Sequence, residues 1–139
     1  MKKIIKRKEL TEDAVKLRLE VFVKEQGIDE KEEITGDDCL FNHYYLYVDD
    51  VLVSYARARK IDDYYLIGRV VTKKECRHMG YSSEVIKYIE QDAVGDGASS
   101  LRLHAQDVSI GFYETLGFTI TSDQYIEAGV KHHNMEKAI

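Results

Sequence analysis

The alternation of apolar and polar positions first predicts a strand followed by a helix. The strand is expected at residues 2–8. From Leu10 to Val21, apolar residues recur at the spacing of one helix face. Thr11 is placed to cap the start of this helix, and Gly27 is placed to end it.

The next segment, residues 28–41, is interpreted as a loop because it carries too much charge for a core element. A connection of this length is often functional. Three strands rich in β-branched and aromatic residues are then expected, at 43–48, 51–60 and 64–72. Asp49-Asp50 and Asp62-Asp63 mark the turns between them, so this run predicts an antiparallel meander.

The second half of the chain alternates helices with strands. A helix is predicted at 80–94, a strand at 99–105, and a short helix from a cap at Asp107 to Gly117. Two closing strands are predicted at 118–126 and 130–138. Strands that pair antiparallel early and alternate with helices later indicate an α/β fold. We expect a mixed, mostly antiparallel central sheet of six to seven strands flanked by helices.

Length and charge narrow the class of protein. At 139 residues, the chain has the usual size of one domain, so residues 1–139 are taken as a single domain. A net charge of −5 argues against a nucleic-acid partner. No stretch approaches the roughly 20 apolar residues of a membrane span. Two cysteines provide neither a disulfide framework nor a metal cluster, so we expect a cytoplasmic protein without a metal.

The segment from Val70 to Ser83 contains the end of an apolar strand, a short polar turn and the start of a helix, where a glycine and two serines occur. Unpaired N–H groups at a helix N-terminus bind phosphate. Gly80 allows close approach of the backbone, and Arg77 can add a charge-assisted contact. The alternative is that Gly80 and Ser82 only begin a helix. The pattern is neither a Walker loop nor a dinucleotide fingerprint.

The segment from Phe112 to Phe118 reads Phe-Tyr-Glu-Thr-Leu-Gly-Phe and predicts a short amphipathic helix that ends at glycine. Tyr113 has two interpretations. It is either a half-buried aromatic residue or a phenol aimed into a cleft, where it can donate a proton to a departing thiolate.

Together, these two segments resemble the GNAT superfamily of N-acetyltransferases. The family's pyrophosphate loop, Arg/Gln-x-x-Gly-x-Gly/Ala, is similar to Arg77-x-x-Gly80-x-Ser82, and its Phe-Tyr-x-x-x-Gly-Phe is matched letter for letter at 112–118. Serine at position 82 departs from the family pattern, but its side chain is the next smallest after those of glycine and alanine. Further motifs are similar to the ElaA-like subgroup: Arg18-x-x-Val21-Phe22-Val23-x-Glu25-Gln26, Ile67-Gly68-Arg69-Val70-Val71, Ala105-Gln106 and Gly129-Val130-x-His132-x-x-Met135.

The resemblance implies a fold in which a splayed strand pair forms the cleft for acetyl-CoA, the co-substrate. It also implies direct attack of an amine on the thioester, with Tyr113 as the general acid. The cofactor-binding residues that it implies are Val70, Val71, Thr72, Arg77, His78, Met79, Gly80, Tyr81, Ser82, Ser83, Gln106 and Phe112.

An amine that is protonated at neutral pH also needs a base. The candidates are Glu25, His43 and His104, each of which can also be a solvated or structural residue, and some family members use a water chain instead. His132-His133 cannot easily share a metal ion, because adjacent strand residues point to opposite faces.

The acceptor end of the site is expected to use Arg18, Gln26, Arg57 and His132, with the two arginines as candidates for an acceptor carboxylate. The alternative for these arginines is simple surface exposure. The acidic segment, with Glu33, Asp37 and Asp38, is either solvated or attracts a cationic acceptor.

The leading hypothesis is an N-acetyltransferase for a primary amine of a small-molecule or peptide-like acceptor. One alternative is a non-catalytic acyl-CoA-binding regulatory module, and another is a scaffold with the same fold and no ligand. Tyr113 favours the enzyme, since a module that only binds needs no acid. A homodimer is compatible with the resemblance.

Overall fold

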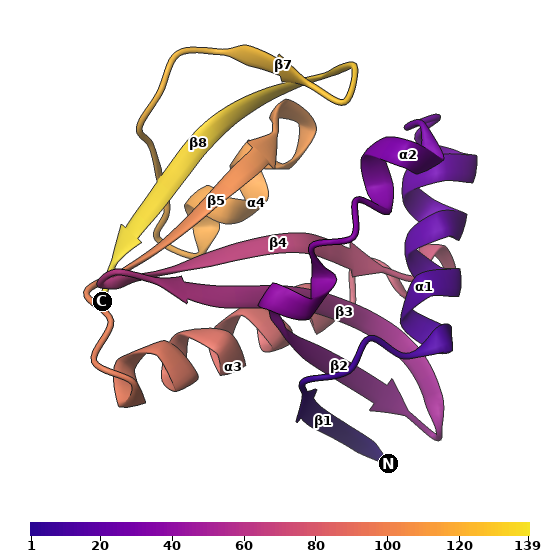
Figure 1. Cartoon of the computed structure of the whole chain (residues 1–139). Coiled ribbons are helices and arrows are strands. Elements are labelled where there is room, and N and C mark those ends of the chain that lie inside the picture. Colours follow the sequence, from indigo (N-terminus) through magenta and orange to yellow (C-terminus); the bar gives the residue numbers. More distant parts are fainter.

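A computed structural model describes all 139 residues and contains one eight-stranded sheet. Its strand order is β1-β2-β3-β4-β5-β8-β6, and β7 also pairs with β8 (Figure 1). Only β4 and β5 are parallel neighbours. The strands are β1 Lys2–Arg7, β2 Asn42–Val48, β3 Val51–Ile61, β4 Tyr64–Thr72, β5 Ser100–Gln106, β6 Thr119–Ile120, β7 Tyr125–Glu127 and β8 Val130–Ala138. The predicted mixed, mostly antiparallel sheet is thus confirmed, with eight strands in place of the six to seven expected.

The helices are α1 Glu12–Arg18, α2 Glu30–Glu33, α3 Tyr81–Gly95 and α4 Ile110–Thr115. A π-helical segment, Leu19–Glu25, continues α1, and 3₁₀ turns occupy Asp38–Leu40, Lys74–Cys76 and Asp107–Ser109. Thr11 caps α1 as predicted, because its hydroxyl accepts the Ala14 N–H at 3.3 Å. None of the helices combines the length and apolar character needed to cross a membrane.

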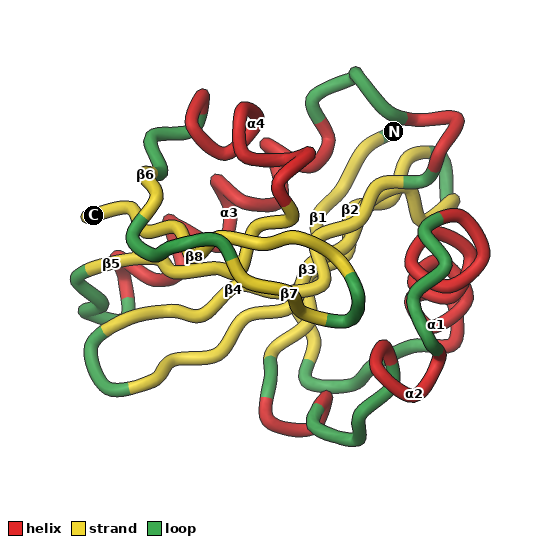
Figure 2. Tube along the Cα trace, turned by 90° about the horizontal axis from the view of Figure 1, so that it is seen from above, coloured by secondary structure: helices red, strands yellow, loops and turns green.

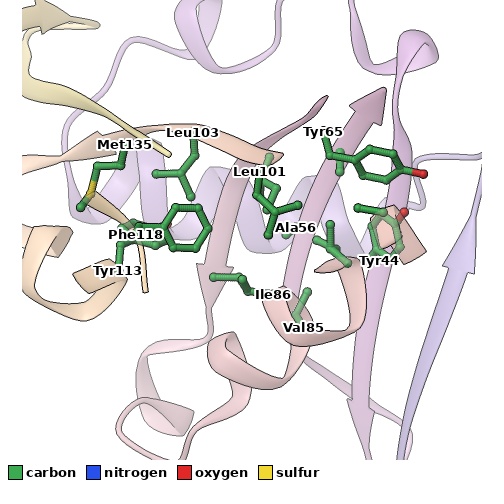
Figure 3. Close-up of a cluster of buried hydrophobic side chains, with 14 of the residues drawn as sticks. Tyr44, Ala56, Tyr65, Val85, Ile86, Leu101, Leu103, Tyr113, Phe118 and Met135 are labelled. Carbon is green, nitrogen blue, oxygen red and sulfur yellow. The ribbon is translucent and has the colours of Figure 1, made fainter. Parts of the chain in front are cut away.

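The two faces of the sheet are buried against different helices. Tyr44 and Leu46 of β2 pack in the core under α3 and α4, whereas Tyr45 between them packs under α1, as the alternation of a strand requires. Seen from above, α3 and α4 lie on one side of the strands and α2 lies on the other (Figure 2). Figure 3 shows the α3 face, where Val85 and Ile86 meet residues of β2–β5.

Strands β4 and β5 separate halfway along their length. They pair only from Tyr64↔Ser100 to Ile67↔Leu103. Beyond that point, β4 has a bulge. Arg57 opposes Gly68 and Tyr55 opposes Val71. The two residues Arg69 and Val70 of β4 therefore face the single residue Ala56 of β3. The two strands therefore diverge (Figure 1) and leave an opening in the middle of the sheet.

Three expectations about local structure were wrong. Residues 28–41 are no simple loop, since they contain α2 and a 3₁₀ turn and their Glu33 side chain is buried. The predicted strand 118–126 is two short strands, β6 and β7. Asp107 does not cap the short helix; its carboxylate instead accepts from His133 Nδ1 at 2.7 Å and from Gln124 Nε2 at 2.6 Å. These two partners lie on the segment and strand that close the chain, so local sequence does not reveal them.

Candidate active site

A cavity of about 420 Å³ lies where β4 and β5 diverge. Its walls come from the end of the first helix, the segment 28–41, the splayed strands, α4 and the β7–β8 hairpin. Of the residues expected to form the site, it brings together Gln26, Arg57, Val70, His104, Gln106, Tyr113 and His132. Glu32, Arg69 and Glu127 also line the cavity and were not anticipated as site residues.

The N-terminus of α3 forms a backbone cradle at the far end of β4. The N–H groups of residues 78–83 have no acceptor in the protein, because the first bond of the helix runs from the Glu84 N–H to the Gly80 carbonyl at 3.1 Å. Gly80 has a φ of +81°, in the left-handed region that favours glycine. Six successive unpaired donors at a helix N-terminus fit a pyrophosphate, as the sequence predicts.

Arg77 directly precedes the first residue of this cradle and forms an ion pair with Glu25. Its Nη1 and Nη2 donate to the two carboxylate oxygens of Glu25 at 2.6 Å and 2.8 Å. Its Nε donates to the Thr72 carbonyl at 3.3 Å. The hydrogen bond from Arg77 lowers the pKa of Glu25, and Glu25 does not line the cavity. The structure therefore places Glu25 outside the cavity, in an ion pair with Arg77.

Ser82, which replaces the glycine or alanine of the family pattern, makes a side-chain hydrogen bond to the end of β4. Its hydroxyl hydrogen-bonds to the Thr72 hydroxyl, which lies 2.9 Å from the Ser54 hydroxyl. Ser54 in turn donates to the Val71 carbonyl. This chain of hydroxyls ties the first turn of α3 to the end of β4, so it fixes the cradle relative to the cavity.

Tyr113 projects from α4 into the apolar core and lines the cavity (Figure 3). Its ring makes edge-to-face contacts with Phe112 and Phe118, with centroid distances of 5.1 Å and 5.8 Å. The neighbouring Phe112 packs against this core and does not line the cavity. Burial raises the pKa of the Tyr113 phenol, and its hydroxyl has no hydrogen-bond partner in the protein. The phenol therefore stays protonated throughout the neutral range.

His104 and Glu127 form a hydrogen-bonded pair in the cavity wall. His104 Nδ1 lies 3.1 Å from Glu127 Oε1, and this bond raises the pKa of His104 and lowers that of Glu127. His132 Nδ1 donates to the Val130 carbonyl at 2.7 Å, which leaves its Nε2 facing Glu127 Oε2 at 3.8 Å. Of the three candidate bases, His104 is the one that lines the cavity. Glu127 lies 23 residues away in the chain, and no local motif marks it.

Two other expected site residues are structural. Both ring nitrogens of His43 are engaged, by the Tyr55 hydroxyl at 2.6 Å and the Asp38 carbonyl at 3.0 Å, and burial lowers its pKa. The Arg18 side chain is 0% exposed and binds Glu33 and Asp38, at 2.5 Å and 2.8 Å. Neither residue lines the cavity, so the structure contradicts His43 as a base and Arg18 as an acceptor-binding residue.

The other acceptor-end residues do reach the cavity. Gln26 accepts a hydrogen bond from Gln106 Nε2 at 2.8 Å, which joins the end of the first helix to the end of β5. Arg57 lines the cavity and binds Asp37 and Asp38 through Nη1. Glu33, Asp37 and Asp38 are thus paired with arginines, so they are not a solvated acidic stretch.

Unpaired backbone donors that suit phosphate thus lie at one end of β4, and a cavity with a phenol and a histidine–carboxylate pair lies along the same strand. A family model for the acetyltransferase (GNAT) domain matches residues 6–139. The chain therefore belongs to the GNAT family and is an acyltransferase.

The similar proteins agree with this assignment. The uncharacterized N-acetyltransferase YjcF of Bacillus subtilis is 34% identical over 135 residues, which cover 96% of each chain. The crystal structure of Escherichia coli ElaA has a TM-score of 0.85 at 28% identity, with 99% of each chain covered. An acyl-CoA N-acyltransferase from Pseudomonas aeruginosa gives a TM-score of 0.83 at 26% identity over 99% of each chain. The resemblance to ElaA-like GNAT proteins is confirmed.

Proposed function

We propose that the enzyme transfers an acetyl group from acetyl-CoA to a primary amine of a small-molecule or peptide-like acceptor by direct attack. The observation that carries this proposal is that Tyr113 and the His104–Glu127 pair line one cavity, at the point where β4 and β5 diverge. The cavity therefore holds one group able to give a proton and one able to take a proton.

The donor end of the site is built on β4 and α3. The unpaired N–H groups from His78 to Ser83 hold the pyrophosphate, and Arg77 adds a positive charge beside it. The edge of β4 at Val70–Thr72 faces the opening left by β5, so its backbone can pair with the pantetheine arm. Acetyl-CoA supplies the thioester carbon that the amine attacks.

Two protons move during the transfer. As the new N–C bond forms, His104 takes a proton from the amine, with Glu127 orienting the ring and stabilising its charge. As the C–S bond breaks, Tyr113 donates its phenolic proton to the leaving thiolate. The phenol is protonated at neutral pH, which is the state required of an acid, and burial raises its pKa further.

The experiment is thermal unfolding with and without acetyl-CoA, followed by release of CoA thiol in the presence of a panel of primary amines. A ligand at about 100 times its Kd adds about 2.7 kcal/mol to the native state, so the unfolding midpoint should rise by several degrees. Dephospho-CoA and ATP are the controls for the adenosine and phosphate parts. A shift without turnover of any amine would contradict the catalytic proposal and favour a module that only binds.

A further inference from the structure

Arg57 lies in the cavity wall with much of its hydrogen-bonding capacity unused. The residue is 5% exposed, and its guanidinium stacks on the Phe41 ring at 3.9 Å from the centroid. Nη1 donates to Asp37 at 3.0 Å and to Asp38 at 2.8 Å. Nε is buried without a partner, and Nη2 donates to no protein group. A guanidinium has five N–H donors, so three of the five are unpaired here.

The unpaired donors share one edge of the guanidinium. Nε–H and one Nη2–H point in parallel, which is the geometry that binds both oxygens of a carboxylate. Buried donors without a partner are rare in folded proteins, and such a donor in a cavity wall points to an external acceptor. The carboxylates of Asp37 and Asp38 both bind Nη1, so neither of them pairs with this edge.

Gly68 borders this edge of Arg57. It opposes Arg57 on the neighbouring strand and also lines the cavity. A Cβ at position 68 would lie 3.7 Å from Arg57 Nε and would contact no other group. Position 68 therefore places no side chain against the unpaired donor, and a methyl group there would contact it directly. The backbone of Gly68 is not left-handed, so the backbone conformation alone does not require glycine at this position.

Arg69 adds a second positive charge to the same wall. It occupies the bulge of β4 with a φ of +52°, a strained conformation for a residue other than glycine. Its Nε lies 2.9 Å from Glu33 Oε2 but is not aligned for a hydrogen bond. Burial, and then the charge of Arg57 among its neighbours, lowers the pKa of Arg69.

We propose that the acceptor carries a carboxylate as well as its amine, and that the Nε–Nη2 edge of Arg57 beside Gly68 binds this carboxylate. The inference rests on the proposed function for the amine. The carboxylate and the amine of the acceptor lie against different walls of the cavity. Arg57 and Arg69, on β3 and β4, face the carboxylate, whereas His104 and Glu127, on β5 and β7, face the amine. The acceptor class is therefore an amino acid or a related amino-carboxylate.

The binding test uses a ligand that cannot react. N-acetylglycine and its uncharged amide, N-acetylglycinamide, are titrated into the ¹⁵N-labelled protein while the Nε–Hε signal of Arg57 is followed by NMR. The signal is assigned by its loss in Arg57→Lys. N-acetylglycine is expected to shift this signal in a saturable manner, and the amide is not.

Gly68→Ala is the variant that tests the site without breaking an ion pair. The added methyl group fills the space beside Nε, so N-acetylglycine should bind at least ten-fold more weakly. Gly95→Ala, in α3, is the matched control because a Cβ there meets nothing within 4 Å. Equal binding of N-acetylglycine to Gly68→Ala and Gly95→Ala would overturn the proposed subsite.

The turnover test compares acids with their amides as acceptors. β-Alanine and 4-aminobutyrate are paired with β-alaninamide and 4-aminobutanamide, in which the amine is distant enough to keep similar basicity. The acids should have at least ten-fold higher kcat/KM, and Gly68→Ala should abolish this preference. Equal use of acids and amides would overturn the carboxylate subsite and leave amine acetylation standing. Binding of N-acetylglycine at Arg57 without acetylation of any amine would leave the subsite standing and contradict the proposed function.

Discussion

Glu25 and Arg77 form a two-pronged ion pair that joins the end of the first helix to the phosphate cradle. The two residues are 52 positions apart in the chain, and both are about one-third exposed. An anion that binds at the cradle has to share Arg77 with this carboxylate. The pair therefore sets how much of the arginine's charge is available to the pyrophosphate.

Glu25→Gln is expected to lower the Kd for acetyl-CoA roughly two- to five-fold, because an exposed ion pair of this kind is worth about 0.2–1 kcal/mol. Arg77→Gln should raise the Kd. Isothermal titration calorimetry measures both. Glu20→Gln is the control, since Glu20 is exposed on the same helical segment and has no ion-pair partner. Weaker binding by Glu25→Gln would mean that Glu25 positions Arg77 instead of competing for it.

Tyr113→Phe is expected to lower kcat about 10²-fold or more while the Kd for acetyl-CoA stays the same. The change removes only the hydroxyl, which has no partner in the protein, so the free energy of unfolding should not fall. Thiol release at saturating substrate and chemical unfolding measure the two effects. Tyr88→Phe, a partly exposed tyrosine of α3, is the control. An unchanged kcat would show that another group protonates the thiolate.

The rate should depend on pH through His104. The ring accepts a proton only when it is neutral, and the hydrogen bond to Glu127 raises its pKa above the ordinary histidine value of 6.5. The profile of kcat/KM should therefore rise with pH through an inflection above 6.5. Glu127→Gln removes the carboxylate, so the inflection should move to lower pH. An inflection that stays in place, or moves up, would exclude His104 as the group that titrates.

Arg18→Met should destabilise the fold by about 3–5 kcal/mol, because it leaves the buried Glu33 carboxylate without its principal partner. Urea unfolding measures the loss. Lys2→Met removes an exposed ion pair with Glu84 and should cost less than about 1 kcal/mol. If Arg18 instead bound the acceptor, the substitution would raise KM with little change in stability.

The sequence by itself determined the order of the main helices and strands, the meander, the cap at Thr11 and the two motifs of the GNAT family. These features depend on interactions between residues close together in the chain. Three local properties carry this information: the alternation of side chains in strands, the spacing of apolar residues in helices, and the φ preferences of residues such as Asp49, Asp50 and Gly80. Each depends only on residues close together in the chain, so the sequence is sufficient to predict it.

Only the tertiary structure decided which charged residues meet. The charge of segment 28–41 predicts a loop, but Glu33 is 3% exposed, and Arg18, 15 positions away, pairs with it. Packing also pairs His104 with Glu127 in the cavity wall, and it pairs Glu25 with Arg77 outside the cavity. The cost of burying a charge depends on the partner that packing brings to it, and that partner is set by sheet register and helix placement. An isolated carboxylate or guanidinium therefore looks the same in the sequence whether it is solvated, structural or part of the site.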